Sequence, residues 1–508
     1  MKIKTKISLK FLLILIIGML YFNNCALAQL TIQPGGFITI EPSGTFYVGT
    51  TMNIESNSTG SGYFVDKTSM ANSVTVTGNI SVERYMLANG WHNVASPVSV
   101  ANASIYSTTD LVFYYDETKI LNDWNFGWVW YQGALSPFKG YDVFLDASAI
   151  TVDYTATNSS GLNTGLYNIG ITKTDVPDGE TANHKGWNLI GNPYPSPIDW
   201  LASSGWDKSN INDAKYIWNP ANDNYTIYLG GASPVGINGG TRYIPSNQGF
   251  WVQATTTANI SINNNVRTGT MTATPDYYKN NEFSYPIISL LAKGNSLSDE
   301  NLIRFIEGTT RNFDRNYDAT KLYSGSKELP QISLSEGNLE FAVNSYPEMT
   351  DDLEIPINFT CQTQGYYCIE LGERTNLNEL NNVYIFDKFE KTIVNLTKNK
   401  QYCFQHDIFN AKQRFSIVIN PSDNKILSLK NSSSFLVYSS GNEINILNLS
   451  NLSKNATVQV VNILGQEVFA KEVILESKIK IVINSGPAYY IVRVTTETEH
   501  FNTTLFIH

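Results

Sequence analysis

Short alternating runs of apolar and polar residues, closed by Gly or Pro, fill most of the chain and predict strands joined by tight turns. In residues 29–82 the runs are especially brief, as in Phe37-Ile-Thr-Ile-Glu-Pro-Ser-Gly44. Brief runs at this spacing are typical of the rungs of a β-solenoid or of a meander. Because such rungs need a neighbour that caps them, we expect this segment to pack against the residues that follow.

The next part of the chain contains an internal duplication. Gly90-Trp-His-Asn-Val-Ala-Ser-Pro97 is echoed by Gly186-Trp-Asn-Leu-Ile-Gly-Asn-Pro193, and Pro137-Phe-Lys-Gly-Tyr-Asp-Val-Phe144 by Ile244-Pro-Ser-Asn-Gln-Gly-Phe-Trp-Val252. The pattern predicts two β-units, at residues 83–180 and 181–265, each with an aromatic hairpin between its two motifs. Since Trp91 and Trp187 recur at one register, we expect both to anchor the cores of their units.

The remainder of the chain predicts two further β-domains. Alternating runs in residues 280–420 favour an antiparallel β-sandwich of immunoglobulin-like or jelly-roll type. Residues 428–508 favour a small immunoglobulin-like β-sandwich, built on Val458-Gln-Val-Val-Asn-Ile-Leu-Gly465 and Tyr489-Tyr-Ile-Val-Arg-Val-Thr495. The predicted fold class is therefore all-β and multidomain.

The first residues have the pattern of a signal peptide. Lys2, Lys4, Lys6 and Lys10 precede an apolar run from Phe11 to Leu20, and Ala26-Leu27-Ala28 supplies small residues for cleavage before Gln29. Residues 1–28 are thus predicted to be a signal peptide. No later run approaches the roughly 18 apolar residues of a spanning helix, so we expect no transmembrane segment in the mature chain. The expected location is extracellular or on the cell surface.

Charge and composition narrow the partners. The formal charge is −10, which argues against nucleic acid and anionic lipid. Aromatic residues make up 12 % of the chain. Trp124, Trp128 and Trp130 lie in an Asn- and Gly-rich stretch without an equally dense counterpart in the second unit. They are candidate ligand-binding residues, because flat aromatic faces stack on sugar rings, and packing under the hairpin is the alternative.

One loop carries alternating side chains that could ligate a metal. Asp314, Asn316 and Asp318 are spaced two apart, as in the first half of a calcium loop. The loop lacks the glycine and the distal glutamate of that motif, and alternating Asx residues also cap turns through the backbone. Calcium is therefore the one candidate cofactor, with turn capping as the alternative.

Three mature cysteines, Cys361, Cys368 and Cys403, leave one thiol unpaired within the chain. Gln364-Gly365 can close a two-residue hairpin that sets Cys361 opposite Cys368, which predicts a disulfide between them. Pairing through Cys403 is the alternative.

No catalytic constellation stands out. The five histidines are scattered without metal-ligand spacing, and a Gly-x-Ser-x-Gly elbow, a His-Glu-x-x-His helix and a phosphate-binding glycine loop are all missing from the sequence. We therefore predict no catalytic residues and a protein that is not an enzyme.

The tail resembles the C-terminal sorting domain (type A) of the bacterial type IX secretion system. Val460-Val-Asn-Ile-Leu-Gly-Gln-Glu-Val468 and Gly486-Pro-Ala-Tyr-Tyr-Ile-Val-Arg-Val494 carry the resemblance, and the upstream region resembles uncharacterised multidomain surface proteins that bear such a tail. The resemblance implies that this secretion machinery is a partner and that the sorting motif comprises Leu464, Gly465, Gly486, Tyr490 and Val492. The family's Pro-Asn-Pro opening and basic end are replaced here by Val437-Tyr-Ser-Ser-Gly-Asn442 and Phe506-Ile507-His508.

These observations predict a secreted or cell-surface protein with a binding, adhesive or structural role, whose C-terminal domain directs its passage across the outer membrane. Its expected ligand is an extracellular glycan or protein. A carbohydrate-binding protein that uses exposed aromatic residues and a secreted enzyme of unrecognised class are the two alternatives.

Overall fold

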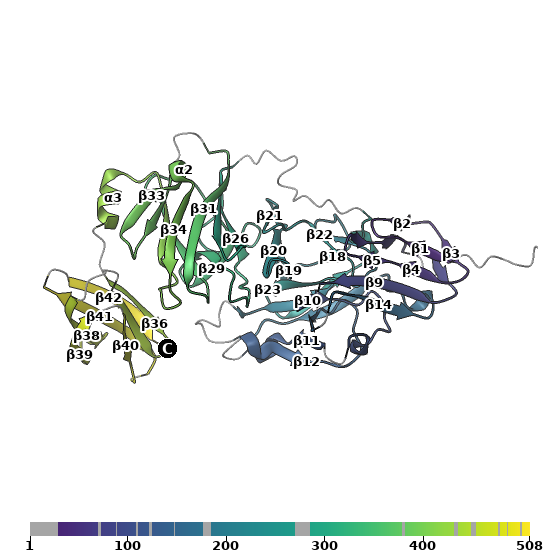
Figure 1. Cartoon of the computed structure of the whole chain (residues 1–508), viewed down its shortest axis with the longest axis horizontal. Coiled ribbons are helices and arrows are strands. Elements are labelled where there is room, and N and C mark those ends of the chain that lie inside the picture. Colours follow the sequence, from purple (N-terminus) through teal and green to yellow (C-terminus); the bar gives the residue numbers. More distant parts are fainter. Residues whose placement is uncertain are drawn as a thin grey trace, which may run out of the picture.

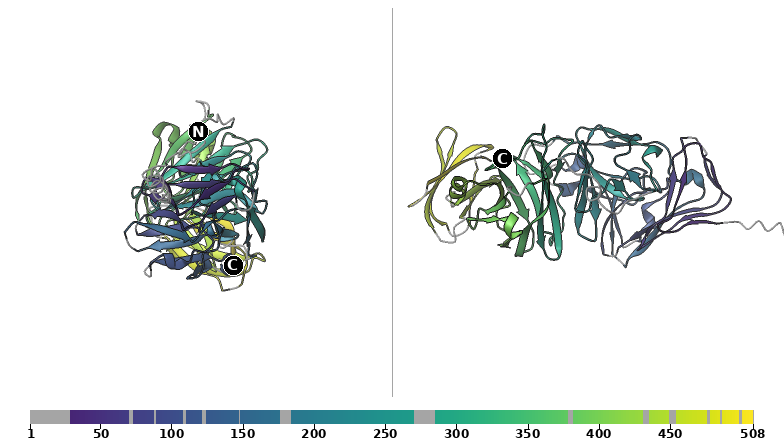
Figure 2. Two further views of the ribbon diagram at one scale, coloured as in Figure 1. Left: turned by 90° about the vertical axis from the view of Figure 1, so that its right-hand side faces the viewer. Right: turned by 90° about the horizontal axis from the view of Figure 1, so that it is seen from above.

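Strands dominate the computed structural model, which confirms the all-β prediction (Figure 1). The structure describes residues 29–69, 73–87, 89–107, 110–120, 124–146, 148–175, 184–269, 285–377, 382–430, 435–448, 454–475, 478–484, 486–497 and 500–507. The predicted signal peptide, residues 1–28, lies outside these ranges. The parts follow one another along the long axis of the molecule, from the N-terminal strands on the right of Figure 1 to the tail on the left, and Figure 2 shows the same order from above.

The N-terminal segment is a short β-solenoid, since its strands pair in parallel and not as a meander. β1 (Leu30–Ile32), β4 (Met52–Ile54) and β9 (Ile80–Met86) form one wall. β2 (Phe37–Ile40) with β7 (Tyr63–Asp66), and β3 (Phe46–Val48) with β8 (Val74–Val76), form the others. A short hairpin, β5 (Ser56–Asn57) and β6 (Gly60–Ser61), interrupts the second rung. The expected cap is present, because β14 (Ile150–Ala156) pairs antiparallel with β9.

The two duplicated units have equivalent sheets. In the first, β10 (Gly90–Val94), β13 (Tyr141–Leu145), β11 (Leu111–Tyr115) and β12 (Trp128–Trp130) lie in that order. In the second the order is β16 (Trp187–Gly191), β23 (Gly249–Ala254), β19 (Ile211–Asn219), β20 (Asn224–Leu229) and β21 (Val235–Ile237). Each sheet therefore places its Gly-Trp strand at an edge, beside the strand of the closing motif.

Reciprocal hydrogen bonds join the two units. The amide of Ala95 donates to the carbonyl of Asn247 at 3.0 Å, and the amide of Gly191, at the equivalent position, donates to the carbonyl of Phe138 at 3.0 Å. Both acceptor residues have a positive φ, 59° at Asn247 and 64° at Phe138. The same contact made twice in opposite directions is the arrangement of a local two-fold axis, and it confirms the duplication.

Strands also cross the predicted boundary between the units. β15 (Tyr167–Ile171) of the first unit pairs with β24 (Ala258–Ile262) of the second. Within the second unit, β24 also pairs with β18 (Trp206–Asp207), and β17 (Ile198–Asp199) pairs with β22 (Tyr243–Ile244). The units are therefore interleaved. Short 3-10 helices connect the strands: η1 (Ala103–Ile105), η2 (Glu117–Lys119), η3 (Trp124–Gly127), η4 (Ser159–Gly161) and η6 (Asn264–Val266).

Residues 287–419 form one continuous, nearly closed sheet where the spacing of strands predicted a two-sheet sandwich. Its order is β33-β32-β35-β30-β28-β29-β26-β25-β31-β34, with β27 beside β29. The strands are β25 (Ile287–Gly294), β26 (Leu297–Phe305), β27 (Ala319–Thr320), β28 (Gln331–Glu336), β29 (Leu339–Tyr346), β30 (Glu354–Thr360), β31 (Gly365–Thr375), β32 (Val383–Asp387), β33 (Thr392–Asn395), β34 (Gln401–His406) and β35 (Phe415–Ile419), with α2 (Leu396–Asn399) between β33 and β34.

This large sheet is fastened to the second unit. Trp187, Tyr216 and Trp251 of the second unit share a buried core with Leu302 and Val343 of the large sheet. A polar network adds to it, because the buried Asp299 accepts hydrogen bonds from the side-chain amides of Asn224 and Asn238, each at 3.0 Å, and pairs with the buried Lys321. The relative position of the two parts is thus set by a shared core and a satisfied buried charge.

The predicted disulfide between Cys361 and Cys368 is wrong. Cys368 is bonded to Cys403, with Cα atoms 4.0 Å apart, and Cys361 is a buried free thiol. The local hairpin on which the prediction depended does not form, since β30 pairs with β28 and β35 whereas β31 pairs with β25 and β34. Cys368 and Cys403 therefore face each other across neighbouring strands.

The tail is a two-sheet sandwich, as predicted. One sheet contains β36 (Phe435–Ser440), β37 (Glu443–Asn448) and β40 (Lys478–Val482), and the other contains β39 (Glu467–Leu475), β38 (Lys454–Asn462), β41 (Ala488–Thr496) and β42 (His500–Ile507). The helix α3 (Asp423–Lys430) precedes it. Within the described parts of the chain, no helix is long and apolar enough to cross a membrane.

Candidate functional site

One face of the first-unit sheet is rich in aromatic side chains. Residues directly opposite each other on antiparallel strands project to the same face, and alternate residues of a strand do so as well. The pairing registers therefore place six aromatic residues together on this face: Trp91, Phe113, Tyr115, Trp128, Trp130 and Phe144. The other face carries Val94, Val112 and Val143 and is buried in the core shared with the solenoid.

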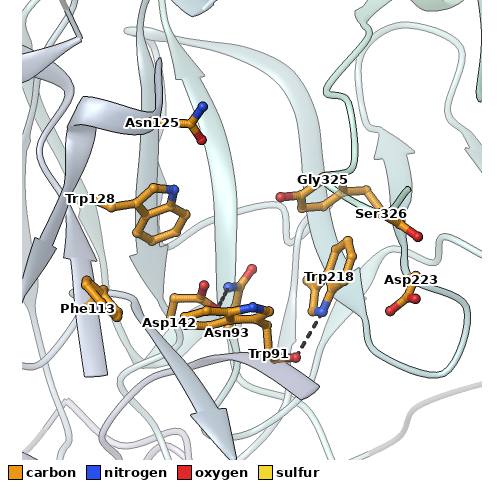
Figure 3. Close-up of a pocket in the computed structure, with 11 residues that line it drawn as sticks. Trp91, Asn93, Phe113, Asn125, Trp128, Asp142, Trp218, Asp223, Gly325 and Ser326 are labelled. Atoms are coloured by element: carbon orange, nitrogen blue, oxygen red, sulfur yellow. Dashed lines mark hydrogen bonds between the residues drawn. The ribbon is translucent and has the colours of Figure 1, made fainter. Parts of the chain in front are cut away.

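A pocket of about 560 Å³ opens on the aromatic face. Its walls come from three parts of the chain, namely the first-unit sheet, the β19–β20 hairpin of the second unit and a loop of the large-sheet domain. The lining residues are Trp91, Asn93, Phe113, Asn125, Trp128, Asp142, Trp218, Asp223, Tyr225, Gly325 and Ser326. In Figure 3 the indoles of Trp128 and Trp218 stand on opposite sides, and Asn93 and Asp142 lie between them beside Trp91.

Contacts among the rings hold the aromatic walls in place. The indole N–H of Trp218 donates to the carbonyl of Trp91 at 2.9 Å, and its ring meets Tyr225 edge to face at 5.1 Å. Trp128 packs edge to face on Trp251, with ring centroids 5.6 Å apart. Because each ring is fixed by another ring or by the backbone, the pocket is formed before any ligand arrives.

The floor of the pocket is polar. The Asn93 side-chain amide donates to a carboxylate oxygen of Asp142 at 2.8 Å, and the Trp251 indole N–H donates to the Asn93 side-chain oxygen at 3.2 Å. Asp142 is only 8 % exposed. Burial raises the pKa of Asp142 to about 7, although the hydrogen bond from Asn93 acts in the opposite direction. The carboxyl group therefore exchanges its proton near neutral pH.

The two copies of the unit differ at these polar positions. Asn93 and Asp142 are paired across β10 and β13, and the equivalent pair across β16 and β23 is Leu189 and Trp251. Leu189 and Trp251 are buried, at 4 % and 1 % exposure. Among the described residues, no cation forms an ion pair with Asp142. A buried carboxyl without a cation costs stability, and such a cost is typical of binding and catalytic sites.

The predicted aromatic candidates have different positions. Trp128 is half-buried and lines the pocket, whereas Trp130 is 58 % exposed and lies on the same face beyond the lining. Trp124 begins η3, and its side chain lies outside the described part of the structure. Trp130 is therefore not packed under the hairpin, which was the alternative prediction for these residues.

Trp91 and Trp187 differ despite their identical motif. Trp187 is 2 % exposed, as expected of a core anchor, but the same prediction is wrong for Trp91, which is 37 % exposed and lines the pocket. The difference in exposure arises from what packs on the sheet face that carries each tryptophan. The large sheet packs on the face of the second unit that carries Trp187, whereas the face that carries Trp91 opens on the pocket.

The candidate calcium loop has its carboxylates engaged by the backbone. Asp318 is fully buried and accepts from the amides of Asp314 at 2.6 Å and Ser345 at 2.8 Å, while the Asp314 carboxylate accepts from the amide of Thr310 at 2.5 Å. The carbonyl of Asn316 accepts from the amide of Ala232 at 3.1 Å. In the described residues, no group of three or more His, Cys, Asp or Glu could hold a metal ion. The geometry favours turn capping over calcium binding.

The residues of the predicted sorting motif lie at the turns and in the core of the tail. Leu464 is 78 % exposed and Gly465 has a φ of +79°, and both belong to the turn between β38 and β39. Tyr490 and Val492 are buried in the tail's core, and the Tyr490 hydroxyl donates to the carbonyl of Gly486 at 3.2 Å.

Most of the pocket was not predicted. Asn93, Asp142, Trp218, Asp223 and Tyr225 were not among the candidate residues, although Trp128 was. One signal was present in the sequence, since aligning the two copies residue by residue places Asn and Asp opposite Leu and Trp. Trp218 and Tyr225 carried no such signal, because their role depends on how the two units face each other.

Comparisons with known proteins add little about function. A family model described as "Domain of unknown function (DUF8693)" matches residues 15–419 and so ends at the last residue of β35, before α3 and the tail. No curated protein matches the chain. Among solved structures, the BSP domain of a biofilm associated protein is similar over 68 % of this chain and 81 % of that chain, with 8 % identity and a TM-score of 0.14. At this TM-score the similarity says nothing about the fold or the function of this chain.

Proposed function

Because the chain belongs to this domain family of unknown function, we propose its role from the pocket itself: a non-catalytic carbohydrate-binding protein that acts outside the cell. The observation that carries the proposal is the buried Asn93–Asp142 pair on the floor of a pocket whose walls are aromatic rings. A sugar needs both features, since its ring has apolar C–H faces and a polar edge of hydroxyl groups.

The pocket provides an aromatic surface and a hydrogen-bonding group at different positions. Trp91, Trp128 and Trp218 offer ring surfaces to the C–H faces of a sugar. The Asp142 carboxyl can accept from a hydroxyl when it is ionised, and can also donate to one when it is protonated. A few polar groups in a mostly apolar pocket are what orient a small ligand and make it specific.

Binding explains the pocket better than glycoside hydrolysis does. Two carboxyl groups line it, those of Asp142 and Asp223, and hydrolysis would require two such groups to flank one glycosidic bond. In Figure 3 the ring of Trp218 stands between Asp142 and Asp223. Asp223 is exposed, whereas Asp142 is buried beside Asn93, and the Trp218 ring separates the two carboxyl groups in this view.

The tail supplies the second part of the proposal, which is export by a type IX secretion system followed by release or attachment at the cell surface. Three features support a separate delivery module. Its sheets contain only tail strands, its core consists of residues 435–507, and the family model ends before it. A glycan-binding protein delivered in this way would serve adhesion.

A glycan array with the protein lacking residues 1–28 tests the binding role. We expect discrete hits that Trp91→Ala weakens by at least about tenfold, because one stacking surface of the pocket is lost. The matched control is Trp130→Ala, which removes an exposed indole from the same sheet face but not from the pocket lining. Binding to no glycan, or equal loss in both variants, would contradict the proposal, and cleavage of a bound glycan would assign the protein to the enzymes.

A reporter fusion tests the export role. Residues 423–508 are fused to a reporter and expressed in a bacterium that has a type IX system, with the unfused reporter as the control. We expect the fused reporter at the cell surface or in the medium. Retention in the periplasm alongside the control would refute the sorting role and would leave the glycan-binding role untouched.

A further inference from the structure

A second pocket adjoins the first. It has a volume of about 560 Å³, and its lining includes Asn125, Gly325 and Ser326, which also line the first pocket. The two cavities therefore meet at the Gly325–Ser326 loop, with Asn125 on the opposite side. Together they form a path that leads from the aromatic face of the first unit onto the surface of the large-sheet domain.

The second pocket differs in chemistry from the first. Its lining includes hydrogen-bonding side chains of the large-sheet domain, among them Tyr323, Gln331, Gln362 and Lys412. The Lys412 ammonium lies 4.4 Å from the centre of the Tyr323 ring and pairs with Glu340 at 2.6 Å, so its charge is compensated. Gln362 is exposed. Lys321, the other lysine in the lining, is paired with Asp299, and the buried Gln331 amide is already bonded to the backbone of Ser324. The Gln362 amide and the rings of Tyr323 and His184 add to a polar surface that suits hydroxyl-bearing groups without a net charge.

We propose that the two pockets form a single groove for an extended, neutral polysaccharide chain, with one sugar unit stacked among the rings of the first pocket and the following units in the second. This inference rests on the proposed carbohydrate-binding function and names its ligand more closely. A monosaccharide would need only the first pocket. A chain also needs a continuous track beyond it, with hydrogen-bonding groups along the way.

The groove is pre-formed, because the two units and the large sheet that line it pack against one another. The buried core that joins Trp187 and Trp251 to Leu302 and Val343 holds the second unit against the large sheet. Trp251 also contacts both the first-pocket ring of Trp128 and the side chain of Asn93. A long ligand would therefore not have to bring separate domains together, so little of its binding energy would be used for ordering.

Gly325 gives a direct way to test continuity. A Cβ atom added there would meet no atom within 4 Å, so a side chain at this position would project into open space. Gly325→Phe should therefore fold normally and place a ring where the two pockets meet. Gly325→Ala is the matched control, since it changes the same backbone position without filling the junction.

The experiment is isothermal titration of the protein lacking residues 1–28 with the cello-, malto-, manno- and chito-oligosaccharide series, from mono- to hexasaccharide. In the series that binds, we expect the hexasaccharide to bind at least about tenfold more tightly than the shortest ligand. Gly325→Phe should abolish the preference for the hexasaccharide over the shortest ligand, whereas Gly325→Ala should keep most of that preference.

Two failures can be told apart. Affinity that is independent of length but lost in Trp91→Ala would overturn the groove and leave the sugar-binding pocket in place, as would a Gly325→Phe protein that still prefers the hexasaccharide. Absence of binding for every series and length, or binding that Trp91→Ala does not alter, would overturn the carbohydrate-binding function and the groove with it.

Discussion

Replacing the buried carboxyl group of the pocket by an amide should make the protein more stable and its binding weaker. In Asp142→Asn the oxygen that accepts from the Asn93 side chain is kept, so the local hydrogen bond at 2.8 Å can persist. What is lost is an ionisable group that is only 8 % exposed and has no cationic partner among the described residues. The variant thus separates the cost of a buried charge from the shape of the site.

The magnitude follows from the pKa of Asp142. Burial raises it from an ordinary value of 3.8 to about 7. At 1.36 kcal/mol for each pKa unit, the ionised carboxyl destabilises the folded state by up to about 4 kcal/mol at about pH 8. The native state holds its proton more tightly than the unfolded state, so this group's contribution to stability is present below about pH 4 and falls as the pH rises to about 7. Asp142→Asn should therefore stabilise the protein most above neutrality.

Other buried groups titrate in the same range, so the comparison must be made between variants. His92 has its pKa lowered to about 4 by burial, first, and by Arg84, and its contribution to stability therefore rises with pH between about 4 and its unfolded value near 6.5. Burial raises the pKa of Asp318 to about 7, which acts in the same direction as Asp142. The difference between wild type and Asp142→Asn cancels both contributions.

The assay is urea unfolding followed by tryptophan fluorescence at about pH 5 and about pH 8, with Asp207→Asn as the control at an exposed aspartate. We expect a gain of about 2–4 kcal/mol at the higher pH, a smaller gain at the lower pH, and no pH-dependent change in the control. A less stable Asp142→Asn protein at about pH 8, or an equal gain at both pH values, would show that Asp142 is not a buried, destabilising carboxyl.

Three further changes test the fold. Trp187→Ala should cost about 3–5 kcal/mol in urea unfolding, because a side chain that is 2 % exposed leaves a cavity between the second unit and the large sheet; a loss below about 1 kcal/mol would contradict that shared core. Cys403→Ser should cost about 3–4 kcal/mol under non-reducing conditions, since the bridge to Cys368 spans 35 residues, whereas Cys361→Ser should leave the disulfide intact in a non-reducing peptide map. Asp299→Ala should cost about 3–5 kcal/mol by stranding the buried ammonium of Lys321, and an Asp299→Asn variant that loses nearly as much would identify the lost charge as the cause.

The sequence pattern was a good guide to elements and a poor guide to their partners. Period-two alternation is a local property, so it located the strands and the duplicated motifs, and the spacing of residues 29–82 narrowed that segment to a solenoid or a meander. Partner choice is non-local. β31 pairs with β25 and β34, which lie far from it in sequence, and this pairing both extends the large sheet and sets Cys368 opposite Cys403. A hairpin drawn from Gln364-Gly365 alone could not anticipate it.

The candidate site was predicted in part for the same reason. Trp128 was identified because aromatic density is visible along the chain, but the pocket is closed by Trp218 and Gly325 from other parts of the fold. Trp91 shows the limit most clearly, since its local motif is that of Trp187 and only the neighbouring layer differs. The solvent exposure of a repeated residue depends on what packs on its sheet, and the repeated sequence motif does not predict that packing.

The two copies of the unit have therefore taken different roles, and each role depends on the other. The second unit uses its apolar face to hold the large sheet, which is why the position of Leu189 and Trp251 stays buried and apolar. The anchored unit then presents Trp218, and the large sheet presents Gly325, toward the face of the first unit. Because the pocket lies over that face at Asn93 and Asp142, these two residues can occupy the positions equivalent to Leu189 and Trp251, although both are buried. In this duplicated fold the second copy is held by packing against the large sheet, and the first copy carries the polar site. The polar site lowers the stability of the protein, and the core shared by the second unit and the large sheet offsets that loss.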